Sequence, residues 1–258
     1  MSQTGPIHLV AHRGDARDFP ENTIPAFASA LSSGVRFLEL DVHLSSDGVP
    51  IVIHDHQLMR TTGLAGSVFE LQAAQLMQRS AHEPQRFGER FRGTRIPLLA
   101  DVLALLEGRP EVTLFVEIKR ASLAHYGHEQ VVSRLVDVLR PAREQCVVIS
   151  FDLAAIYRAR QLGGFAIGWV LSDYDPHARL KYEAVQPEFL FCDHARLPVR
   201  GALWRGPWRW VIYEIDAWDT ALALAARGVQ YIETMAVQPM CQALHAWQAA
   251  APASAPPT

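Results

Sequence analysis

Apolar residues along this chain fall into short runs that alternate with longer stretches of helical period. Nine strand-like runs are expected, at residues 7–11, 37–42, 51–54, 112–118, 146–151, 165–171, 188–192, 210–215 and 229–233. Apolar residues spaced three and four apart predict helices between most of these runs, at residues 23–33, 98–106, 129–139, 153–162, 176–184, 217–227 and 239–248. The alternation predicts an α/β fold.

The third run is expected to be an antiparallel excursion. Asp47-Gly48 lies between the second and third runs and is typical of a hairpin turn, whereas parallel neighbours need a crossover of about a dozen residues. Eight strands then remain, each expected to precede a helical stretch, and they predict a single-domain TIM (β/α)8 barrel. An open doubly wound sheet shares the alternation, but it usually carries a glycine-rich turn after its first strand, and His12-Arg13-Gly14 is not such a turn.

Two segments depart from the regular pattern. Residues 59–95 are polar and irregular and are expected to form a small insertion with one helix at residues 70–78. Residues 249–258 are alanine, proline and serine with one threonine, which predicts a disordered tail after a domain of residues 1–248.

Composition and charge narrow the function classes. The 258 residues are 49% hydrophobic and 20% charged with a net charge of -3, which is typical of a globular domain and gives no reason to expect nucleic acid as a partner. The sequence shows no secretory signal and no long apolar run, so we expect no stable membrane association. Cys146, Cys192 and Cys241 are widely spaced in apolar surroundings and predict reduced, buried thiols, which favours a cytoplasmic location.

Carboxylates occur where apolar strands end. Glu39 and Asp41 are two residues apart on one predicted strand, so both side chains point to the same face. The hairpin brings His54 back beside Asp41, and Glu117 ends the next parallel strand. Functional residues of such barrels lie at the carboxyl ends of the strands, so the three carboxylates are expected to converge.

Oxygen ligands without cysteine favour a hard divalent cation, namely magnesium, calcium or manganese. Three carboxylates and one such ion sum to -1, and Arg13 with Lys119 brings the cluster to +1, which suits a phosphodiester monoanion. In the loop after the first strand, Asn22 is expected to cap the first helix. Glu21 is expected to be a partner of Arg13 or of the metal site.

An ordered set of motifs across the first 120 residues resembles the signature of the glycerophosphodiester phosphodiesterases, in the compact bacterial cytoplasmic form. The motifs are His12-Arg13-Gly14, Pro20-Glu21-Asn22-Thr23, Glu39-Leu40-Asp41-Val42, Asp47-Gly48-Val49-Pro50, His54-Asp55, Arg60-Thr61-Thr62-Gly63, Ile96-Pro97-Leu98-Leu99 and Glu117-Ile118-Lys119. Each motif is weak alone, and their order makes the resemblance specific.

The resemblance implies a barrel related to phosphatidylinositol-specific phospholipases and a role for each motif residue. The implied metal ligands are Glu39, Asp41 and Glu117, the acid and base are His12 and His54, and the groups that hold the phosphoryl oxygens are Arg13 and Lys119. The implied reaction is hydrolysis of a glycerophosphodiester, such as glycerophosphocholine or glycerophosphoethanolamine, to glycerol 3-phosphate and an alcohol. Such a reaction belongs to glycerol and lipid metabolism.

The second half of the chain matches the family less well. The family's Trp-Thr-Val-Asn stands here as Tyr213-Glu214-Ile215-Asp216, and its Thr-Asp pair stands as Thr234-Met235. Candidate aromatic walls for the substrate are Phe151, Trp169 and Tyr213. Two alternatives stay open: a lysophospholipase D, and a catalytically silent barrel that binds a phosphorylated ligand.

Overall fold

The computed structural model describes residues 6–250, apart from the side chains of residues 176–178. Its strands are β1 His8–His12, β2 Phe37–Leu44, β3 Pro50–Val52, β4 Thr113–Ile118, β5 Cys146–Ser150, β6 Ala166–Val170, β7 Phe189–Asp193, β8 Arg209–Tyr213 and β9 Tyr231–Thr234. Each one overlaps a run expected from the sequence. The predicted number and order of strands are therefore confirmed.

Eight parallel strands close into a barrel. Their order is β1-β9-β8-β7-β6-β5-β4-β2, and β1 pairs with β2 to complete the circle. The register places His12 beside Glu39, and Asp41 beside Glu117. The single-domain barrel predicted from the alternation is confirmed, and the open doubly wound sheet is excluded by the closing pair.

The hairpin after β2 has the predicted form. β3 pairs antiparallel with β2, and the amide of Ile53 donates to the carbonyl of Asp41 at 3.0 Å. Gly48 adopts a φ of 75°, a conformation that glycine reaches without strain. This return strand brings His54 over the carboxyl end of β2.

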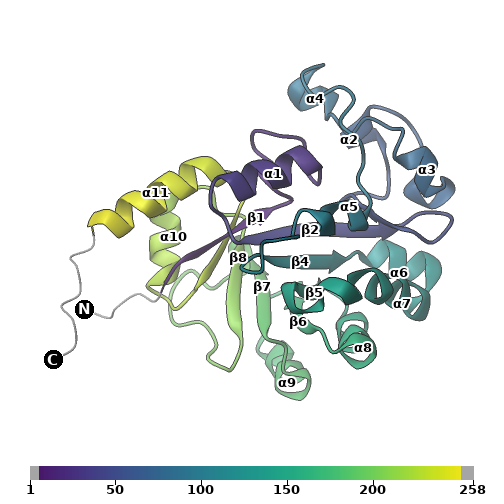
Figure 1. Ribbon diagram of the computed structural model, residues 1–258. Helices are drawn as coiled ribbons and strands as arrows, with labels where there is room; N and C mark the ends of the chain where they lie inside the picture. Colours follow the sequence, from purple (N-terminus) through teal and green to yellow (C-terminus); the bar gives the residue numbers. More distant parts are fainter. Residues whose placement is uncertain (1–5, 251–258) are drawn as a thin grey trace.

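Helices cover the outside of the barrel (Figure 1). They are α1 Ile24–Ser32, α5 Leu99–Ala104, α6 Arg120–Tyr126, α7 His128–Leu139, α8 Leu153–Gly163, α9 Pro176–Val185, α10 Trp218–Ala225 and α11 Val237–Ala250. Helix α11 extends two residues past the predicted boundary at 248, and residues 251–258 of the predicted tail lie outside the described residues. No helix within residues 6–250 has both the length and the apolar character needed to cross a membrane.

One connection lacks the expected helix. Between β7 and β8 the chain forms only the 3-10 turn η3, His194–Arg196, followed by an irregular segment, so the expectation of a helix after every strand was wrong here. Aromatic rings from this segment fill the outer layer instead. Trp204 stacks on Tyr174 with ring centroids 4.1 Å apart, and Trp208 lies 5.4 Å from Tyr182.

The insertion is built from short pieces, α2 Met59–Thr62, η1 Val68–Glu70, α3 Ala73–Leu76 and α4 Pro84–Phe87. The single helix expected at 70–78 was wrong, because Leu71 and Gln72 are both extended and separate η1 from α3. The pieces pack on a hydrophobic cluster of their own, which includes Leu58, Val68 and Leu76. Figure 1 shows this insertion at one side of the barrel.

Alternation along the strands divides the barrel into two apolar layers. The inward set includes Val10, Phe115, Ile149, Phe191 and Tyr231 and forms a compact cluster inside the barrel. The outward set packs against the helices in a larger cluster. Inward positions repeat every second residue along a strand. At the carboxyl ends of several strands, a polar side chain occupies the inward position.

Candidate active site

The carboxyl ends of the strands bring polar side chains to one mouth of the barrel. His12 ends β1, Glu39 and Asp41 lie on β2, and Glu117 and Glu233 lie near the ends of β4 and β9. All five are buried. Buried charged groups need partners or a bound cation, so this end of the barrel is the candidate site.

The polar groups surround a small cavity of about 130 Å³ that adjoins a wider groove of about 460 Å³. The cavity is lined by His12, Arg13, Glu39, His54, Glu117, Lys119, Ile149, Phe151, Val170, Phe191, Tyr213, Glu214 and Glu233. The groove shares His54, Glu117, Lys119 and Phe151 with the cavity and adds His43, Asp55, His56, Gln57, Arg120 and Ala121. The cavity is therefore the more enclosed of the two chambers, and the groove is the more open.

Glu39, Asp41 and Glu117 offer carboxylate oxygens that all lie within 4.8 Å of one another. Two cations already approach them: Lys119 Nζ lies 3.0 Å from both Asp41 Oδ1 and Glu117 Oε1, and Arg13 Nε lies 3.1 Å from Asp41 Oδ2. The predicted convergence of the three carboxylates is therefore what the structure shows. Glu39 Oε1 is buried without a hydrogen-bond partner among the described residues.

Electrostatics differ among the three carboxylates. Burial and the neighbouring charges of Asp41 and Glu233 hold the pKa of Glu39 well above its usual value, and burial raises the pKa of Glu117. Burial also disfavours the ionised form of Asp41, but Lys119 and Arg13 outweigh it and hold that pKa well below its usual value. The cluster is thus short of positive charge around Glu39.

A hard divalent ion fits this donor set. The three side chains supply oxygen atoms only, and the orphaned Glu39 oxygen lacks the partner that an ion would provide. The same atoms would suit magnesium, calcium or manganese. The groups here could therefore hold a metal, and their donor chemistry leaves its identity open.

The two histidines have different surroundings. His54 Nδ1 lies 2.6 Å from Asp55 Oδ1, and Arg60 binds the other oxygen of Asp55. His12 Nδ1 lies 3.1 Å from Glu214 Oε1. The carboxylate behind His54 Nδ1 orients that ring and favours a proton on that nitrogen, whereas His12 Nδ1 approaches Glu214 without forming a hydrogen bond.

The two imidazoles also differ in charge preference. Burial lowers the pKa of His12, but Glu233 and Glu214 outweigh it and the net pKa is raised. Burial lowers the pKa of His54, assisted by Arg13 and Lys119 and only partly offset by Asp41. His12 is therefore favoured in its protonated form and His54 in its neutral form.

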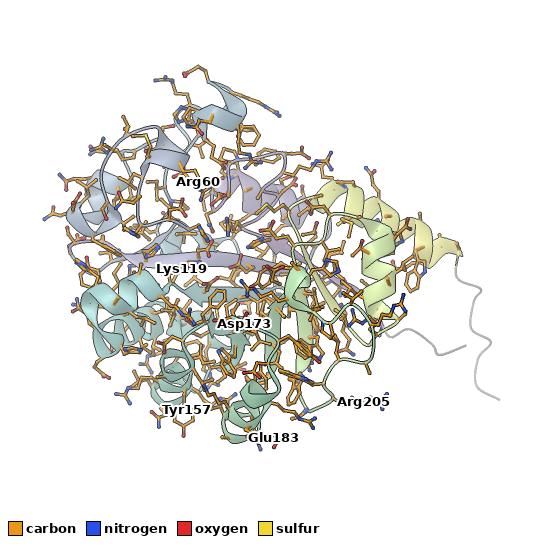
Figure 2. The ribbon with its side chains drawn as sticks, turned by 180° about the vertical axis from the view of Figure 1, so that it is seen from behind. Arg60, Lys119, Tyr157, Asp173, Glu183 and Arg205 are labelled. Carbon is orange, nitrogen blue, oxygen red and sulfur yellow. The ribbon has the colours of Figure 1, made fainter. Side chains whose placement is uncertain are left out.

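A network of ion pairs supports Arg13. Arg60 donates to both oxygens of Glu21 at 2.7 and 2.8 Å, and Arg13 Nη1 lies 3.3 Å from Glu21 Oε1. Figure 2 shows Arg60 on the insertion and Lys119 on the barrel. Glu21 lines neither the cavity nor the groove, and it contacts Arg13, one of the partners expected for it, together with Arg60.

Two other expected residues are placed differently. Trp169 faces the helix layer, where it packs on Tyr182, because Gly168 and Val170 on either side of it take the inward positions of β6. Trp169 is therefore not a wall of the cavity, whereas Phe151 and Tyr213 are. Asn22 does not cap α1.

The amide of Asn22 instead donates to Asp41 Oδ2 at 2.8 Å, and its backbone has a φ of 56°. The helix begins after Thr23 without a side-chain cap. Asn22 therefore fixes a proposed metal ligand, which is a role that the capping interpretation missed.

Glu233 is the main site residue that the sequence interpretation missed. Its signal was present, because a glutamate within the apolar run Tyr231-Ile232-Glu233 repeats the pattern used for Glu39 and Glu117. Glu214 was noted only as a departure, and it contacts His12. Both residues come from the half of the chain that resembles the family less.

Comparison with known proteins agrees with this geometry. A glycerophosphodiester phosphodiesterase from Caldanaerobacter subterraneus subsp. tengcongensis is 35% identical over 56% of this chain, and one from Bacillus altitudinis is 37% identical over 50%. The chain spans 58% and 52% of the lengths of these two relatives, about half of each.

Solved structures share the fold over nearly the whole chain. A phosphodiesterase from Oleispira antarctica, in complex with the product sn-glycerol-3-phosphate, superposes with a TM-score of 0.80 at 23% identity and covers 93% of this chain and 96% of its own. A glycerophosphodiester phosphodiesterase from Agrobacterium tumefaciens gives a TM-score of 0.74 at 23% identity, over 92% of this chain and 99% of its own. Residues 12–234 match the model of the glycerophosphoryl diester phosphodiesterase family, and the chain belongs to that family.

Proposed function

We propose that this protein hydrolyses glycerophosphodiesters, such as glycerophosphocholine and glycerophosphoethanolamine, to sn-glycerol 3-phosphate and an alcohol. The observation that carries the proposal is that two histidines and two cationic side chains line one cavity together with Glu39 and Glu117 of the carboxylate cluster. Family membership and the product bound to the Oleispira antarctica phosphodiesterase support the same substrate class. The three unpaired, buried thiols support a cytoplasmic location.

Each group in the cavity has a distinct proposed role. Arg13 and Lys119 bind the non-bridging phosphoryl oxygens and stabilise the charge that grows in the transition state. His54, favoured neutral, accepts the proton of the attacking oxygen, and His12, favoured protonated, donates one to the leaving alkoxide. Proton transfers of this kind each contribute typically about 10²–10⁴-fold.

Glu39, Asp41 and Glu117 would hold the divalent ion, and when bound it would polarise the phosphoryl group. Asn22 and Lys119 hold Asp41 in place, so that ligand is already oriented. Phe151 and Tyr213 would exclude water from one side of the phosphodiester.

The proposal is tested by release of glycerol 3-phosphate from the two named substrates with magnesium, calcium or manganese. We expect activity that EDTA removes, and a loss of at least about 100-fold in both His12→Asn and His54→Asn. The exposed His245 provides the control, since His245→Asn should keep full activity. Binding of glycerol 3-phosphate without turnover of any phosphodiester would contradict the proposal and favour a silent binding barrel.

A further inference from the structure

Glu233 is a buried carboxylate that the proposed acid–base chemistry does not use. Its side chain is 3% exposed and lines the cavity. Among residues 6–250 no hydrogen-bond donor pairs with it, and its nearest cationic atom is His12 Nε2 at 4.0 Å. A buried carboxylate without a donor lacks a partner that a cation could provide.

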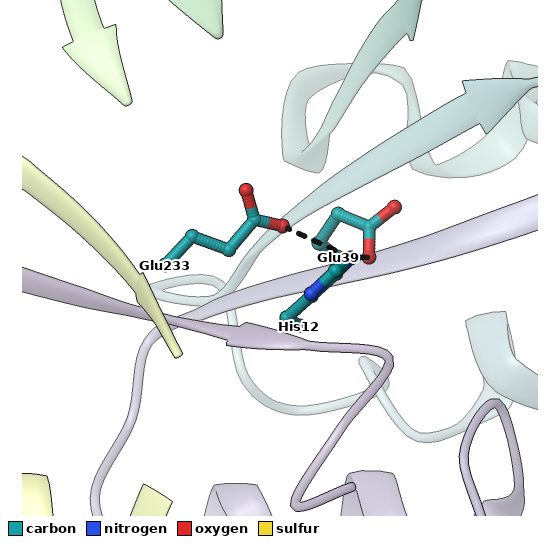
Figure 3. Close-up of side chains that lie close together, drawn as sticks. All are labelled: His12, Glu39 and Glu233. Carbon is teal, nitrogen blue, oxygen red and sulfur yellow. Dashed lines mark ion pairs between the residues drawn. The ribbon is translucent and has the colours of Figure 1, made fainter. Parts of the chain in front are cut away.

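Three potential ligand atoms converge at this point. His12 Nε2 lies 3.7 Å from Glu39 Oε2 and 4.0 Å from Glu233 Oε1 (Figure 3). These separations are too long for hydrogen bonds. Ligands of one tetrahedral zinc ion lie roughly 3.3–3.6 Å apart, given bonds of about 2.0–2.2 Å. His12 Nε2 is therefore within about half an ångström of this spacing from each carboxylate, and one ligand atom of each side chain lies within 4.8 Å of the other two.

The orientation of His12 is an independent indication. Its Nδ1 lies 3.1 Å from Glu214 Oε1, and its Nε2 lies on the side of Glu39 and Glu233. Metal-binding histidines almost always have a carboxylate or carbonyl behind the other ring nitrogen. Glu214 therefore completes the arrangement of a histidine ligand with its supporting carboxylate.

We propose that His12, Glu39 and Glu233 form a second cation site, selective for zinc-like ions, whose occupation inhibits the enzyme. Imidazole with carboxylate favours zinc, whereas the all-oxygen cluster of Glu39, Asp41 and Glu117 favours magnesium or calcium. Glu39 has two oxygens and can serve both sites. A cation on Nε2 would occupy the position of the proton that His12 is proposed to donate.

Charge counting explains why a cation is tolerated there. Five carboxylates, Glu39, Asp41, Glu117, Glu214 and Glu233, stand against Arg13 and Lys119, which leaves a formal -3. One divalent ion reduces this to -1, which still opposes an anionic substrate. A second divalent ion at His12, Glu39 and Glu233 would bring the formal charge to +1.

Zinc binding to the whole chain, measured without substrate and with saturating magnesium, tests the site directly. We expect the wild type to bind one zinc ion tightly, Glu233→Gln to bind it at least 100-fold more weakly, and Glu214→Gln to lose about 10- to 100-fold. Glutamine keeps the shape of Glu233 and removes the burial of a charge, so that variant should fold. The exposed Glu111 gives the control, and Glu111→Gln should match the wild type. Equal zinc affinity in the wild type and Glu233→Gln would overturn the proposal.

The inhibitory effect rests on the proposed function and is measured separately. Each variant is assayed with magnesium and a glycerophosphodiester, and the zinc concentration for half-inhibition is taken relative to the variant's own rate. We expect that concentration to rise at least 10-fold in Glu233→Gln. Zinc binding that depends on Glu233 would uphold the site even if no phosphodiester were hydrolysed, and binding without inhibition would overturn the regulatory half of the proposal.

Discussion

At the scale of single residues, the buried carboxylate of Glu21 connects two arginines from distant parts of the chain. Burial alone would raise its pKa, but hydrogen bonds from Arg60 and the charge of Arg13 lower it below the usual value. Arg60 also binds Asp55, which lies behind His54. Arg60 of the insertion is therefore linked through Glu21 to Arg13, the proposed phosphate ligand, and through Asp55 to His54, the proposed base.

We expect Glu21→Ala to lower the free energy of unfolding by about 3 kcal/mol at pH 7, because it leaves buried Arg13 without one of its partners. The folded-state pKa is depressed, so this contribution is present above the unfolded pKa of about 4.3 and is lost as the pH falls through the folded value. Urea unfolding at pH 7 and below pH about 4 should show the difference between wild type and variant narrowing in acid.

The exposed pair of Glu89 and Arg92 offers the matched control for that measurement. Glu89→Ala should leave the urea midpoint unchanged, because water screens the pair. An equal effect of Glu21→Ala and Glu89→Ala would show that the Glu21 network does not stabilise the fold.

The three cysteines give a second prediction at this scale. Burial raises the pKa of Cys146 and of Cys192 to about 12, and it also raises the pKa of Cys241. Thiolates are the reactive form, so we expect almost no reaction with a disulfide reagent at pH 8 in the folded protein and three reacted thiols per chain after denaturation. Rapid labelling of any thiol in the folded protein would contradict the burial of all three.

At the scale of elements, the connection from β1 to α1 depends on close backbone approach at Gly14. Its φ is 83°, and a Cβ there would lie 2.7 Å from the carbonyl carbon of Ala26 and 2.9 Å from the amide nitrogen of Phe27. Both are backbone atoms, which cannot move away as the end of a flexible side chain could. This close contact fixes the position of the loop that carries Arg13 and Glu21.

We expect Gly14→Ala to destabilise the protein by about 3 kcal/mol, since strain at positive φ adds to the clash. Gly34 follows α1 with a φ of 87°, and no atom of the described residues lies within 4 Å of the place that a Cβ would take there. Gly34→Ala therefore introduces strain at positive φ without a clash and should lower the free energy of unfolding by about 1 kcal/mol. Chemical denaturation of the two variants gives the comparison, and equal losses would mean that the contact with α1 is not tight.

Element periodicity predicted the barrel because short apolar runs alternate with stretches of helical period along the chain. It failed between β7 and β8, where Trp204 and Trp208 fill the outer layer without a repeating pattern. Glu39, Asp41 and Glu117 could be found from carboxylates inside apolar runs. The same rule applied to β9 would have found Glu233, whereas the contact of Asn22 with Asp41 depends on a positive φ that no sequence pattern predicts.

At the scale of the whole molecule, the barrel and the insertion pack on different hydrophobic clusters. Leu135 of α7 belongs to the large cluster between strands and helices, and Leu76 of α3 belongs to the smaller cluster under the insertion. Both side chains are almost fully buried. A small separate cluster can open without the rest of the fold, so the insertion is expected to be the less stable unit.

Hydrogen exchange followed by mass spectrometry would separate the two units. In the wild type we expect amides of residues 59–95 to exchange through a smaller opening free energy than those of residues 113–150. Leu76→Ala and Leu135→Ala remove the same buried atoms, each at a cost of about 2–5 kcal/mol. Leu76→Ala should accelerate exchange in the insertion alone, because the barrel keeps its core, whereas Leu135→Ala should accelerate exchange throughout the barrel. Uniform acceleration across both regions in Leu76→Ala would instead show that the molecule opens as a single cooperative unit. The contacts of Arg60 with Glu21 and Asp55 could then not be lost while the barrel stays folded.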